Sequence, residues 1–379
     1  MGVNKGLESF EKQFPTDAKI SIIIPVYNDP EGLRSCLESL YALADDNYEI
    51  IVADDASEKD TARVCDPERV RIIRLARNSG PGATRNEGAA HAGGSILAFI
   101  DADCTAPPDW LARMREAFSD QRIVAVAGTY SDQHVKGVAS EVRFLEAAYY
   151  HRKDRIFVNA YISANFAIRA DVFRKVGGFP PIRQCAEDLL LGYKLWLSGL
   201  SILWIPDLKV GQYFRPTLSR YFRQQMNWSR GVSTIGAVYP ATMALTWNVR
   251  RGVLQAQFLL QTVALLGAAW AVGLGGSWWF SAVAAGGCIL LNVPFIRFVT
   301  RKKSLLSAGR CLLVVLCIRN MAHLAGVSLT TLKYPLTTLW ALRIAIGRIL
   351  GERQTHGGPS IEEVDNHFPP NSDWSLITP

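Results

Sequence analysis

Near the start of the chain, residues 20–28 read ISIIIPVYN, an unbroken run of mostly β-branched residues that ends in a turn signal. Such a run is typical of a strand buried on both faces, as strands of parallel sheets are. Residues 30–44 follow with Leu33, Leu37 and Leu40 at helical spacing. The first part of the chain therefore predicts a buried strand followed by a helix packed against it.

Three further apolar runs continue this pattern. Residues 49–53, 70–75 and 97–100 each end at polar or glycine-bearing turns, and a helix is predicted from the glycine turn near residue 80 through residue 92. Strands that alternate with helices predict an α/β fold with a doubly wound, mostly parallel sheet. Ligands of such sheets bind at the carboxyl ends of the strands.

Four carboxylates follow directly on two of these strands. Asp54 and Asp55 end the second strand, and Asp101 and Asp103 end the fourth. Alternate residues of a strand share a face, so Asp101 and Asp103 converge just beyond the sheet. Four like charges at one edge repel one another unless a cation or a ligand donor neutralises them. Hard oxygen ligands suit Mg²⁺ or Mn²⁺ holding a diphosphate, although an acidic turn or a helix cap would use the same residues.

The order of short motifs resembles that of the inverting family 2 glycosyltransferases, which have the GT-A fold. The resemblance extends from about residue 19 to about residue 232. Each motif is weak by itself, and seven in the same order make a strong pattern. They are Ile24-Pro25-Val26-Tyr27-Asn28, Asp54-Asp55-Ala56-Ser57, the stretch from Asn78 through Gly80 to Thr84-Arg85-Asn86, Asp101-Ala102-Asp103, Ser163 to Arg169, Val176-Gly177-Gly178-Phe179 and Glu187-Asp188.

The resemblance implies a nucleotide-sugar donor whose base lies at the ends of the first two strands. Asp54 or Asp55 would accept a hydrogen bond from the imide N–H of a uracil-type base, and the backbone near Pro25 and Tyr27 would frame the ring. An aspartate that caps the following helix is the alternative for either carboxylate.

The same resemblance implies a divalent cation, Mg²⁺ or Mn²⁺, as cofactor. Asp103 would be the main metal ligand, with Asp101 nearer the ribose or the water shell of the metal. Arg77 and Arg85 flank a glycine-bearing turn at a helix start, where a phosphate finds N–H donors and a positive dipole end. Arg85 is as readily interpreted as a solvated helix residue.

An inverting transfer needs a general base near the acceptor hydroxyl, on the face of the sugar opposite the leaving diphosphate. Asp188 occupies the position of the base in the family, and Glu187 beside it would orient or hydrogen-bond. The alternative is a charge pair favoured by the helix dipole, because a helical stretch begins at this point. The implied reaction is a single displacement without a covalent nucleophile.

The chain departs from the family pattern at two positions. Gln212 stands where many relatives place a histidine, and an amide is a poor metal ligand. Asn227 replaces the arginine of the Q-x-x-R-W motif of processive members. The candidates for the acceptor site are Asn165, Trp228 and Arg230, because aromatic rings stack on the faces of sugars. Trp228 is interpreted equally well as an anchor at the membrane interface.

The C-terminal half predicts membrane helices. No Asp, Glu, Lys, Arg or His occurs between Arg251 and Arg297. Because about 20 apolar residues cross a bilayer, this gap predicts two passes, 253–274 and 278–298. Basic residues beside both ends of the hairpin place those ends in the cytoplasm. Residues 304–350 either form a second hairpin or lie partly in the interface as an amphipathic helix, and we expect an even number of crossings.

The charge is divided unevenly along the chain. The formal net charge is +7, and residues 250–353 hold twelve Lys and Arg but only one acidic residue, Glu352. This basicity favours an anionic membrane surface as partner and argues against a nucleic acid. Arg319 and His323, four residues apart, would either contact a lipid headgroup or pair with backbone carbonyls. The seven cysteines contain no C-x-x-C pair and are interpreted as free thiols.

These features predict four regions: an N-terminal extension (1–19), a catalytic domain (20–235), a membrane region with interfacial and transmembrane helices (236–350) and a cytoplasmic tail (351–379). The implied activity is the transfer of one sugar from a nucleotide-sugar to a lipid or lipid-linked saccharide, as in cell-envelope glycan synthesis. The expected location is the inner or plasma membrane, with the catalytic domain facing the cytoplasm.

Two other functions remain open at this point. A processive polysaccharide synthase would need a longer helical bundle and the arginine that Asn227 replaces. A non-catalytic membrane scaffold or transport component with a degenerate nucleotide-binding domain would explain Gln212 and Asn227. The intact carboxylates argue against that second alternative, and binding of a nucleotide diphosphate with Mn²⁺ would separate the two classes.

Overall fold

The computed structural model describes residues 18–150, 157–158, 161–180, 186–214, 217–238 and 253–333. The chain divides into two compact units. The first comprises Met1–His134, His151–Tyr213 and Arg353–Pro379, and the second comprises Val135–Tyr150 and Phe214–Glu352, in each case as far as these residues are described.

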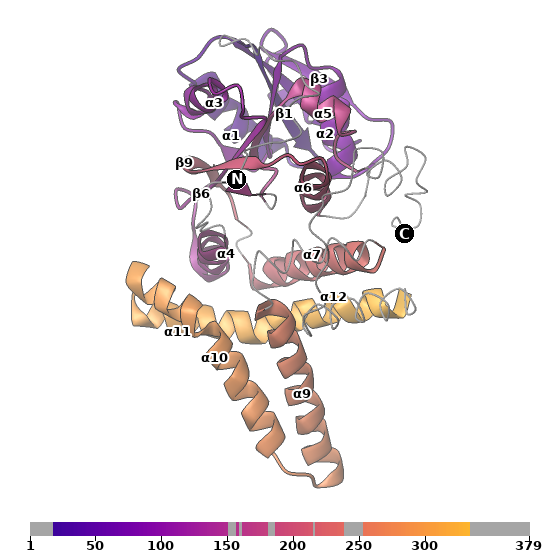
Figure 1. Ribbon diagram of the computed structural model, residues 1–379, viewed down its shortest axis with the longest axis vertical. Helices are drawn as coiled ribbons and strands as arrows, with labels where there is room; N and C mark the ends of the chain where they lie inside the picture. Colours follow the sequence, from indigo (N-terminus) through magenta and orange to yellow (C-terminus); the bar gives the residue numbers. More distant parts are fainter. Residues whose placement is uncertain are drawn as a thin grey trace. The chain divides into compact units, whose positions relative to one another are not determined.

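A mixed, mostly parallel sheet forms the centre of the first unit (Figure 1). The strands β1 to β4 are parallel to one another and carry the apolar runs of the sequence, and β8 beside β4 is antiparallel. The strand order is β3-β2-β1-β4-β8-β6-β9-β5, with β7 paired to β9. The bounds are Ile20–Val26 (β1), Tyr48–Asp54 (β2), Val70–Arg74 (β3), Ile96–Ile100 (β4), Cys104–Thr105 (β5), Ala125–Ser131 (β6), Phe157–Val158 (β7), Asn165–Arg169 (β8) and Ile202–Gln212 (β9).

Helices flank this sheet, and the sequence of the first of them, α1, explains why that helix forms. Asp29 is the N-cap of α1 and accepts a hydrogen bond from the Gly32 N–H, while the predicted leucines Leu33, Leu37 and Leu40 are buried. The sheet and the helices that alternate with its strands confirm the predicted doubly wound α/β class. The helices of the unit are α1 (Pro30–Tyr41), η2 (Ala62–Val64), α2 (Pro81–Ala90), α3 (Trp110–Phe118), α5 (Ala170–Lys175) and α6 (Glu187–Leu197).

An aromatic cluster fills the core beside β4 and β8. Phe99 of β4 lies against Phe166, Phe173 and Phe179, with ring centroids 6.0, 5.5 and 5.2 Å away. All four rings are buried. Because Phe99 is two residues before Asp101, this packing fixes the end of the strand that carries the aspartates.

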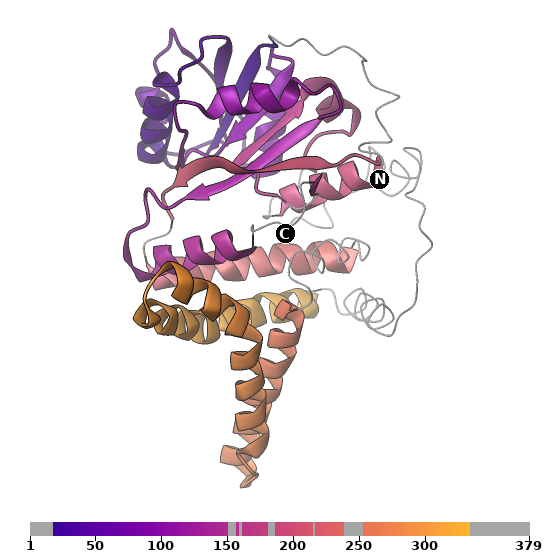
Figure 2. The same cartoon turned by 60° about the vertical axis from the view of Figure 1, so that its left-hand side comes forward.

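The second unit is helical (Figure 2). Its helices are α4 (Gly137–Tyr150), α7 (Leu218–Val238), α9 (Val253–Leu274), α10 (Trp279–Lys302), α11 (Leu305–Val314), the π-helical turn η4 (Val315–Arg319) and α12 (Asn320–Lys333). The helices α9 and α10 form a hairpin whose turn includes Gly275 at a φ of +68°, and α11 to α12 run across the base of that hairpin beside α7.

Two helices of this unit are long and apolar enough to cross a membrane by length and composition, Trp279–Lys302 and the continuous run Leu305–Leu332. The first of them falls where the second predicted pass was expected, and α9 has the bounds of the first predicted pass.

A buried ion pair holds the second unit together. Arg319 donates from Nη1 to Glu146 Oε1 at 2.7 Å and from Nη2 to Gln257 Oε1 at 2.5 Å, and Tyr221 donates to Glu146 Oε2 at 2.7 Å. Arg319 is therefore neither at a lipid surface nor paired with backbone carbonyls, the two expectations for it. Arg319 thus contacts α4 and α9, and Tyr221 of α7 binds the same glutamate as Arg319. These contacts explain why α4 and α7 cluster with the C-terminal helices, although the predicted catalytic domain (20–235) included α4 and most of α7.

Candidate functional site

Arg85 joins the two stretches of the chain that were predicted to carry the chemistry. Its Nη2 donates to Asp101 Oδ1 at 2.6 Å and its Nη1 donates to Glu187 Oε1 at 2.5 Å. Arg85 is only 3% exposed, and Glu187 is also buried. The end of β4 and the start of α6 thus meet at the Arg85 guanidinium, although Asp101 and Glu187 are 86 positions apart in the sequence. Arg85 is a bridging residue of the site and not a solvated helix residue.

Two carboxylates at the start of α6 follow a residue whose backbone conformation is strained. Ala186, the N-cap, has a φ of +87°, which is unfavourable for a residue with a Cβ atom. Glu187 and Asp188 then occupy the first turn of the helix. Burial, and after it the charge of Glu187, raise the pKa of Asp188 to about 7, while Arg85 opposes the rise. Asp188 therefore has the protonation equilibrium expected of a general base near neutral pH.

Two motifs of the sequence, the one that contains Asn86 and the one that ends at Phe179, are joined by hydrogen bonds. The Asn86 side chain donates to the Phe179 carbonyl at 2.6 Å and accepts from the Phe179 N–H at 2.9 Å. Lys194 of α6 donates to the Gly177 and Gly178 carbonyls, both at 3.2 Å. These contacts fix α2 against the segment that leads toward α6, and they hold the Phe179 ring 5.5 Å from the Arg85 guanidinium.

Asp103 lies in the turn between β4 and β5, beside the end of β9. Gln212 Nε2 is 3.4 Å from Asp103 Oδ1, and the Tyr213 N–H donates to the Asp103 carbonyl at 2.9 Å. Tyr213 stacks on His134 with ring centroids 3.9 Å apart, and His134 Nε2 lies 2.8 Å from Thr105 Oγ1. The position predicted for the family histidine is thus taken by an amide, with a different histidine on the neighbouring loop.

The residues at this turn fit a cation that arrives with its ligand. Within the described ranges, no group of three or more His, Cys, Asp or Glu side chains could hold a metal ion. Asp101 is engaged by Arg85, and Asp103 presents a partly exposed carboxylate. Mg²⁺ is usually bound by one or two carboxylates together with substrate phosphates and water. Asp103, with Asp101 beside it, meets that requirement, whereas a resident metal site would need more ligands.

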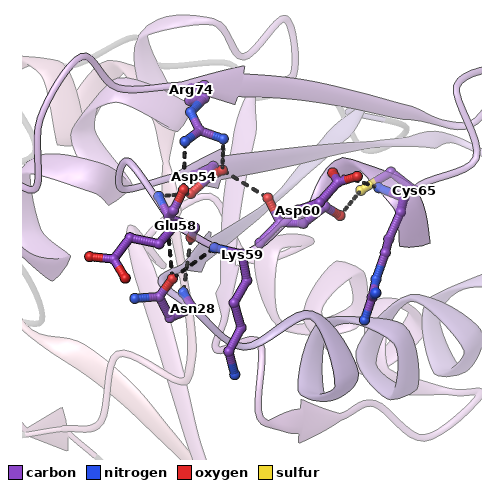
Figure 3. Close-up of polar contacts among 10 residues, drawn as sticks. Asn28, Asp54, Glu58, Lys59, Asp60, Cys65 and Arg74 are labelled. Atoms are coloured by element: carbon purple, nitrogen blue, oxygen red, sulfur yellow. Dashed lines mark hydrogen bonds and ion pairs between the residues drawn. The ribbon is translucent and has the colours of Figure 1, made fainter.

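Asp54 and Asp55 are both engaged in hydrogen bonds within the protein. Asp54 accepts from the Ser57 N–H and from Thr61 Oγ1, both at 2.8 Å, and pairs with Arg74 (Figure 3). Asp55 accepts from the N–H groups of Ser79 and Gly80 at the start of α2, at 2.6 and 2.9 Å. These contacts brace the loop after β2 and the turn before α2, and neither of them is the cap of the following helix that was the alternative interpretation. Contact with a donor base stays a prediction for both.

Asn28 ties the first two motifs together. Its Oδ1 accepts from the N–H groups of Glu58 and Lys59 at 2.8 and 3.2 Å, as Figure 3 shows. Asn28 itself has a φ of +55°, a conformation that asparagine tolerates better than most residues. The adjacent Tyr27 is 49% exposed and Pro25 is half-buried, so both are available beside this loop. Arg77 is exposed.

Asn165 is buried and hydrogen-bonded inside the sheet, and its role toward an acceptor stays a prediction. Its side chain is 0% exposed, and its Oδ1 accepts from Trp110 Nε1 at 3.0 Å. Its Nδ2 donates to the carbonyls of Thr129 and Leu208 at 3.0 and 2.8 Å. The amide has its hydrogen-bonding groups used inside the sheet, where it joins β8 to β6, β9 and α3.

Trp228 and Arg230 belong to the second unit. The ring of Trp228 lies 5.8 Å from that of His323, and the Arg230 carbonyl is 3.5 Å from Thr330 Oγ1. Both residues therefore lie on the face of α7 that meets α12. Their role toward an acceptor stays a prediction.

Three features of the site were not predicted from the sequence: the bridging role of Arg85, the Asn86–Phe179 pair and the participation of Lys194. One signal was available for the first. The stretch around Arg85 carries Gly82 and Gly88, and a Cβ at Gly82 would lie 2.7 Å from the Pro180 carbonyl oxygen. A Cβ at Gly88 would lie 2.6 Å from Ile23 Cγ2, so the two glycines mark close packing of α2 on different neighbours. A polar side chain on a helix packed in this way is expected to be buried and paired.

The mixed sheet with flanking helices and the carboxylates at its carboxyl edge resemble the GT-A architecture of enzymes that use nucleotide-sugars. Residues 21–177 match the family described as Glycosyl transferase family 2.

Curated relatives agree with this assignment. The chain is 29% identical over 197 residues to the glycosyltransferase AglE of Haloferax volcanii, covering 50% of this chain and 65% of the relative. It is 26% identical over 241 residues to the pre-mycofactocin glycosyltransferase of Mycobacterium tuberculosis, covering 60% and 49%. The matched part thus spans about half to two thirds of the length of these relatives.

A solved structure shows a weak similarity to this chain. A mannosyltransferase from Pyrobaculum calidifontis, in complex with GDP-Man and Mn²⁺, shares 16% identity and a TM-score of 0.47, covering 92% of this chain and 93% of that one. At this level of similarity its donor and its metal are properties of that protein alone.

Proposed function

We propose that this protein is a membrane-anchored inverting glycosyltransferase. It transfers one sugar from a nucleotide-sugar to a lipid or lipid-linked saccharide by a metal-assisted single displacement. The observation that supports this most directly is the Arg85 bridge, because it brings the end of β4, which carries Asp101 and Asp103, to the start of α6, which carries Glu187 and Asp188. A metal-binding carboxylate and a base are the two groups that the reaction requires.

Each of these side chains has a separate role in the proposed reaction. Asp103, with Asp101 beside it, would hold the divalent cation, which when bound neutralises the leaving diphosphate. Asp188 takes the proton of the acceptor hydroxyl as that oxygen bonds to the anomeric carbon and the bond to the diphosphate breaks. Arg85 keeps Asp101 and Glu187 in place and limits the pKa of Asp188, so that a useful fraction of Asp188 is ionised at neutral pH.

Two isosteric variants test this assignment. The purified full chain is incubated with a panel of nucleotide-sugars, and release of the nucleoside diphosphate is measured with and without Mn²⁺. Asp188→Asn is expected to abolish release while calorimetry still detects Mn²⁺-dependent binding of the diphosphate, whereas Asp103→Asn is expected to lose that binding. Asp109→Asn, at an exposed aspartate before α3, serves as the control. Unchanged activity in both Asp188→Asn and Asp103→Asn would refute the proposed mechanism.

The second unit supports a membrane-anchoring role. We propose that the α9–α10 hairpin crosses the bilayer and that α11 to α12 lie at its surface. The reason is that α12 packs along α7, and buried Arg319 bonds to Glu146 of α4. Charged helices such as α4 and α7 do not enter the hydrocarbon core, so they keep α12 outside it.

The start of α11 has the composition of an interfacial segment. Leu305 and Leu306 are 78% and 71% exposed, and the preceding residues Arg301, Lys302 and Lys303 are exposed cations. Leucines that enter the interface below a cationic cluster bind an anionic leaflet. An enzyme held at that surface gains effective concentration toward acceptors that share the membrane, which is why a lipid-linked acceptor is the proposed substrate class.

A further inference from the structure

The side chain of Gln212, at the end of β9, contacts the carboxylate to which the proposed function assigns the cation. Its Nε2 donates to Asp103 Oδ1 at 3.4 Å, and the thiol of Cys104 donates to the same oxygen at 3.6 Å. Because an ionised carboxylate only accepts hydrogen bonds, the amide has to present its NH₂ group to it. Gln212 is 9% exposed, so this contact is largely removed from water.

The backbone holds residue 212 beside Asp103 whatever its side chain. Gln212 lies opposite Cys104 in the antiparallel pair of β9 and β5, and the N–H of Tyr213 donates to the Asp103 carbonyl at 2.9 Å. The ladder of backbone hydrogen bonds sets the separation of two strands independently of their side chains. The identity of residue 212 therefore decides which type of atom lies next to the Asp103 carboxylate.

The described histidines of the first unit have other partners. His134 has its Nε2 2.8 Å from Thr105 Oγ1, and its ring stacks on Tyr213 with centroids 3.9 Å apart. His91 follows the last residue of α2, and its Nδ1 lies 2.9 Å from the Glu87 carbonyl oxygen. The ten residues of α2 place His91 about 15 Å from the start of that helix at the site edge. Among the described residues, the groups that the end of β4 offers to a cation are therefore oxygen atoms.

We propose that Gln212 sets the cation preference of the enzyme: an amide at this position leaves a cation site made of oxygen ligands only, which accepts Mg²⁺ nearly as well as Mn²⁺. This proposal rests on the proposed function, because it takes Asp103 as a ligand of the cation. Mg²⁺ is a hard ion that prefers oxygen, whereas nitrogen ligands favour transition metals, and Co²⁺ more than Mn²⁺. Either orientation of the Gln212 amide preserves this preference, because the one ligand atom that an amide offers is its oxygen.

The ratio of the Mg²⁺ and Mn²⁺ dissociation constants measures this preference without any turnover. The full chain in detergent is saturated with Mn²⁺ and UDP, or with Mn²⁺ and GDP in a second series, and Mg²⁺ is then added. Displaced Mn²⁺ is followed by its electron paramagnetic resonance signal, and samples without protein correct for binding to the nucleotide alone. In the wild type the two dissociation constants are expected to agree within about tenfold.

Gln212→His places an imidazole beside Asp103. This variant is expected to raise the ratio of the Mg²⁺ to the Mn²⁺ dissociation constant by about tenfold or more, and to raise the ratio of Mg²⁺ to Co²⁺ further. Gln212→Glu keeps an oxygen and adds a charge, so both cations are expected to bind more tightly at an unchanged ratio. Gln133→His is the matched control: Gln133 is exposed, and its Oε1 is 3.0 Å from where a Cβ at Gly211 would lie, but an imidazole on this loop is expected to leave the ratio unchanged.

Three results would overturn the proposal for Gln212. The first is a wild-type ratio above about tenfold in favour of Mn²⁺, which would reveal a nitrogen ligand from another part of the chain. The second is an unchanged ratio in a Gln212→His protein that melts at the wild-type temperature. The third is a Gln212→Glu protein that binds both cations with wild-type affinity, which decides the matter if Gln212→His does not fold. A wild type that binds neither cation with either nucleotide would instead contradict the proposed function itself, because Asp103 would then hold no cation.

Discussion

Replacement of Arg85 by Met removes the guanidinium that bridges Asp101 and Glu187 and leaves a side chain of similar length. Arg85 and Glu187 are 3% and 7% exposed at the side chain, so the carboxylate of Glu187 would remain buried without its cation. Breaking a buried ion pair by removing one partner costs about 3–5 kcal/mol. For a folding unit of about 150–250 residues this corresponds to a fall in melting temperature of about 6–20 °C.

The pH dependence of this loss separates electrostatics from packing. Arg85 holds down the pKa of Asp188, which is about 7 in the intact site, so the variant carries a still higher value. A carboxyl whose pKa is raised on folding binds a proton in the folded state that the unfolded chain releases, so its contribution to stability falls as pH rises. Arg85→Met is therefore expected to be destabilised more at pH 7.5 than at pH 5.5.

The assay is thermal unfolding of the full chain in detergent, followed by tryptophan fluorescence at both pH values; Trp110, a buried tryptophan of the first unit, is one of the reporters. Arg122→Met, which breaks an exposed pair with Asp120, is the control and is expected to match the wild type. Equal destabilisation of Arg85→Met at both pH values, or none at all, would refute the reasoning that Arg85 neutralises buried carboxylates.

Three other outcomes are expected. Because the pKa of Asp188 is raised to about 7 and the base must be ionised, kcat/KM is expected to fall about tenfold per pH unit below pH 7, and a flat profile from pH 5 to 8 would remove Asp188 as base. Asn165→Ala leaves buried partners of its amide unsatisfied and is expected to lower the free energy of unfolding by about 3 kcal/mol in urea titrations, without weakening nucleotide diphosphate binding. Ser277→Cys, in the turn between α9 and α10, is expected to react with an impermeant maleimide only from the side of the membrane opposite the catalytic unit; labelling from the catalytic side would contradict the hairpin topology.

Periodicity was sufficient for the elements that are buried on a regular pattern. The run of residues 20–28 is apolar without interruption because β1 is covered on both faces, and the leucines of α1 recur at helical spacing because one face meets the sheet. The charge-free stretch between Arg251 and Arg297 gave the bounds of α9 for the same reason. In each case the environment of the element is uniform along its length, so the sequence records it directly.

The roles of individual polar residues required contacts between distant parts of the chain. Asp101 and Glu187 could be placed at strand and helix ends, but no local pattern states that Arg85 lies between them. The sequence around Asn165 does not show whether its amide binds a ligand or joins neighbouring strands. Only the tertiary structure shows its three hydrogen bonds inside the sheet.

What the sequence determined by itself was therefore the class of fold, the edge of the sheet at which carboxylates gather and the hairpin of the second unit. What the tertiary structure decided was which charges pair with which: Arg85 with Asp101 and Glu187 in the first unit, and Arg319 with Glu146 in the second. The physical reason is that backbone periodicity acts over a few residues, whereas the energy of a buried charge depends on which opposite charge the whole fold brings within hydrogen-bond distance.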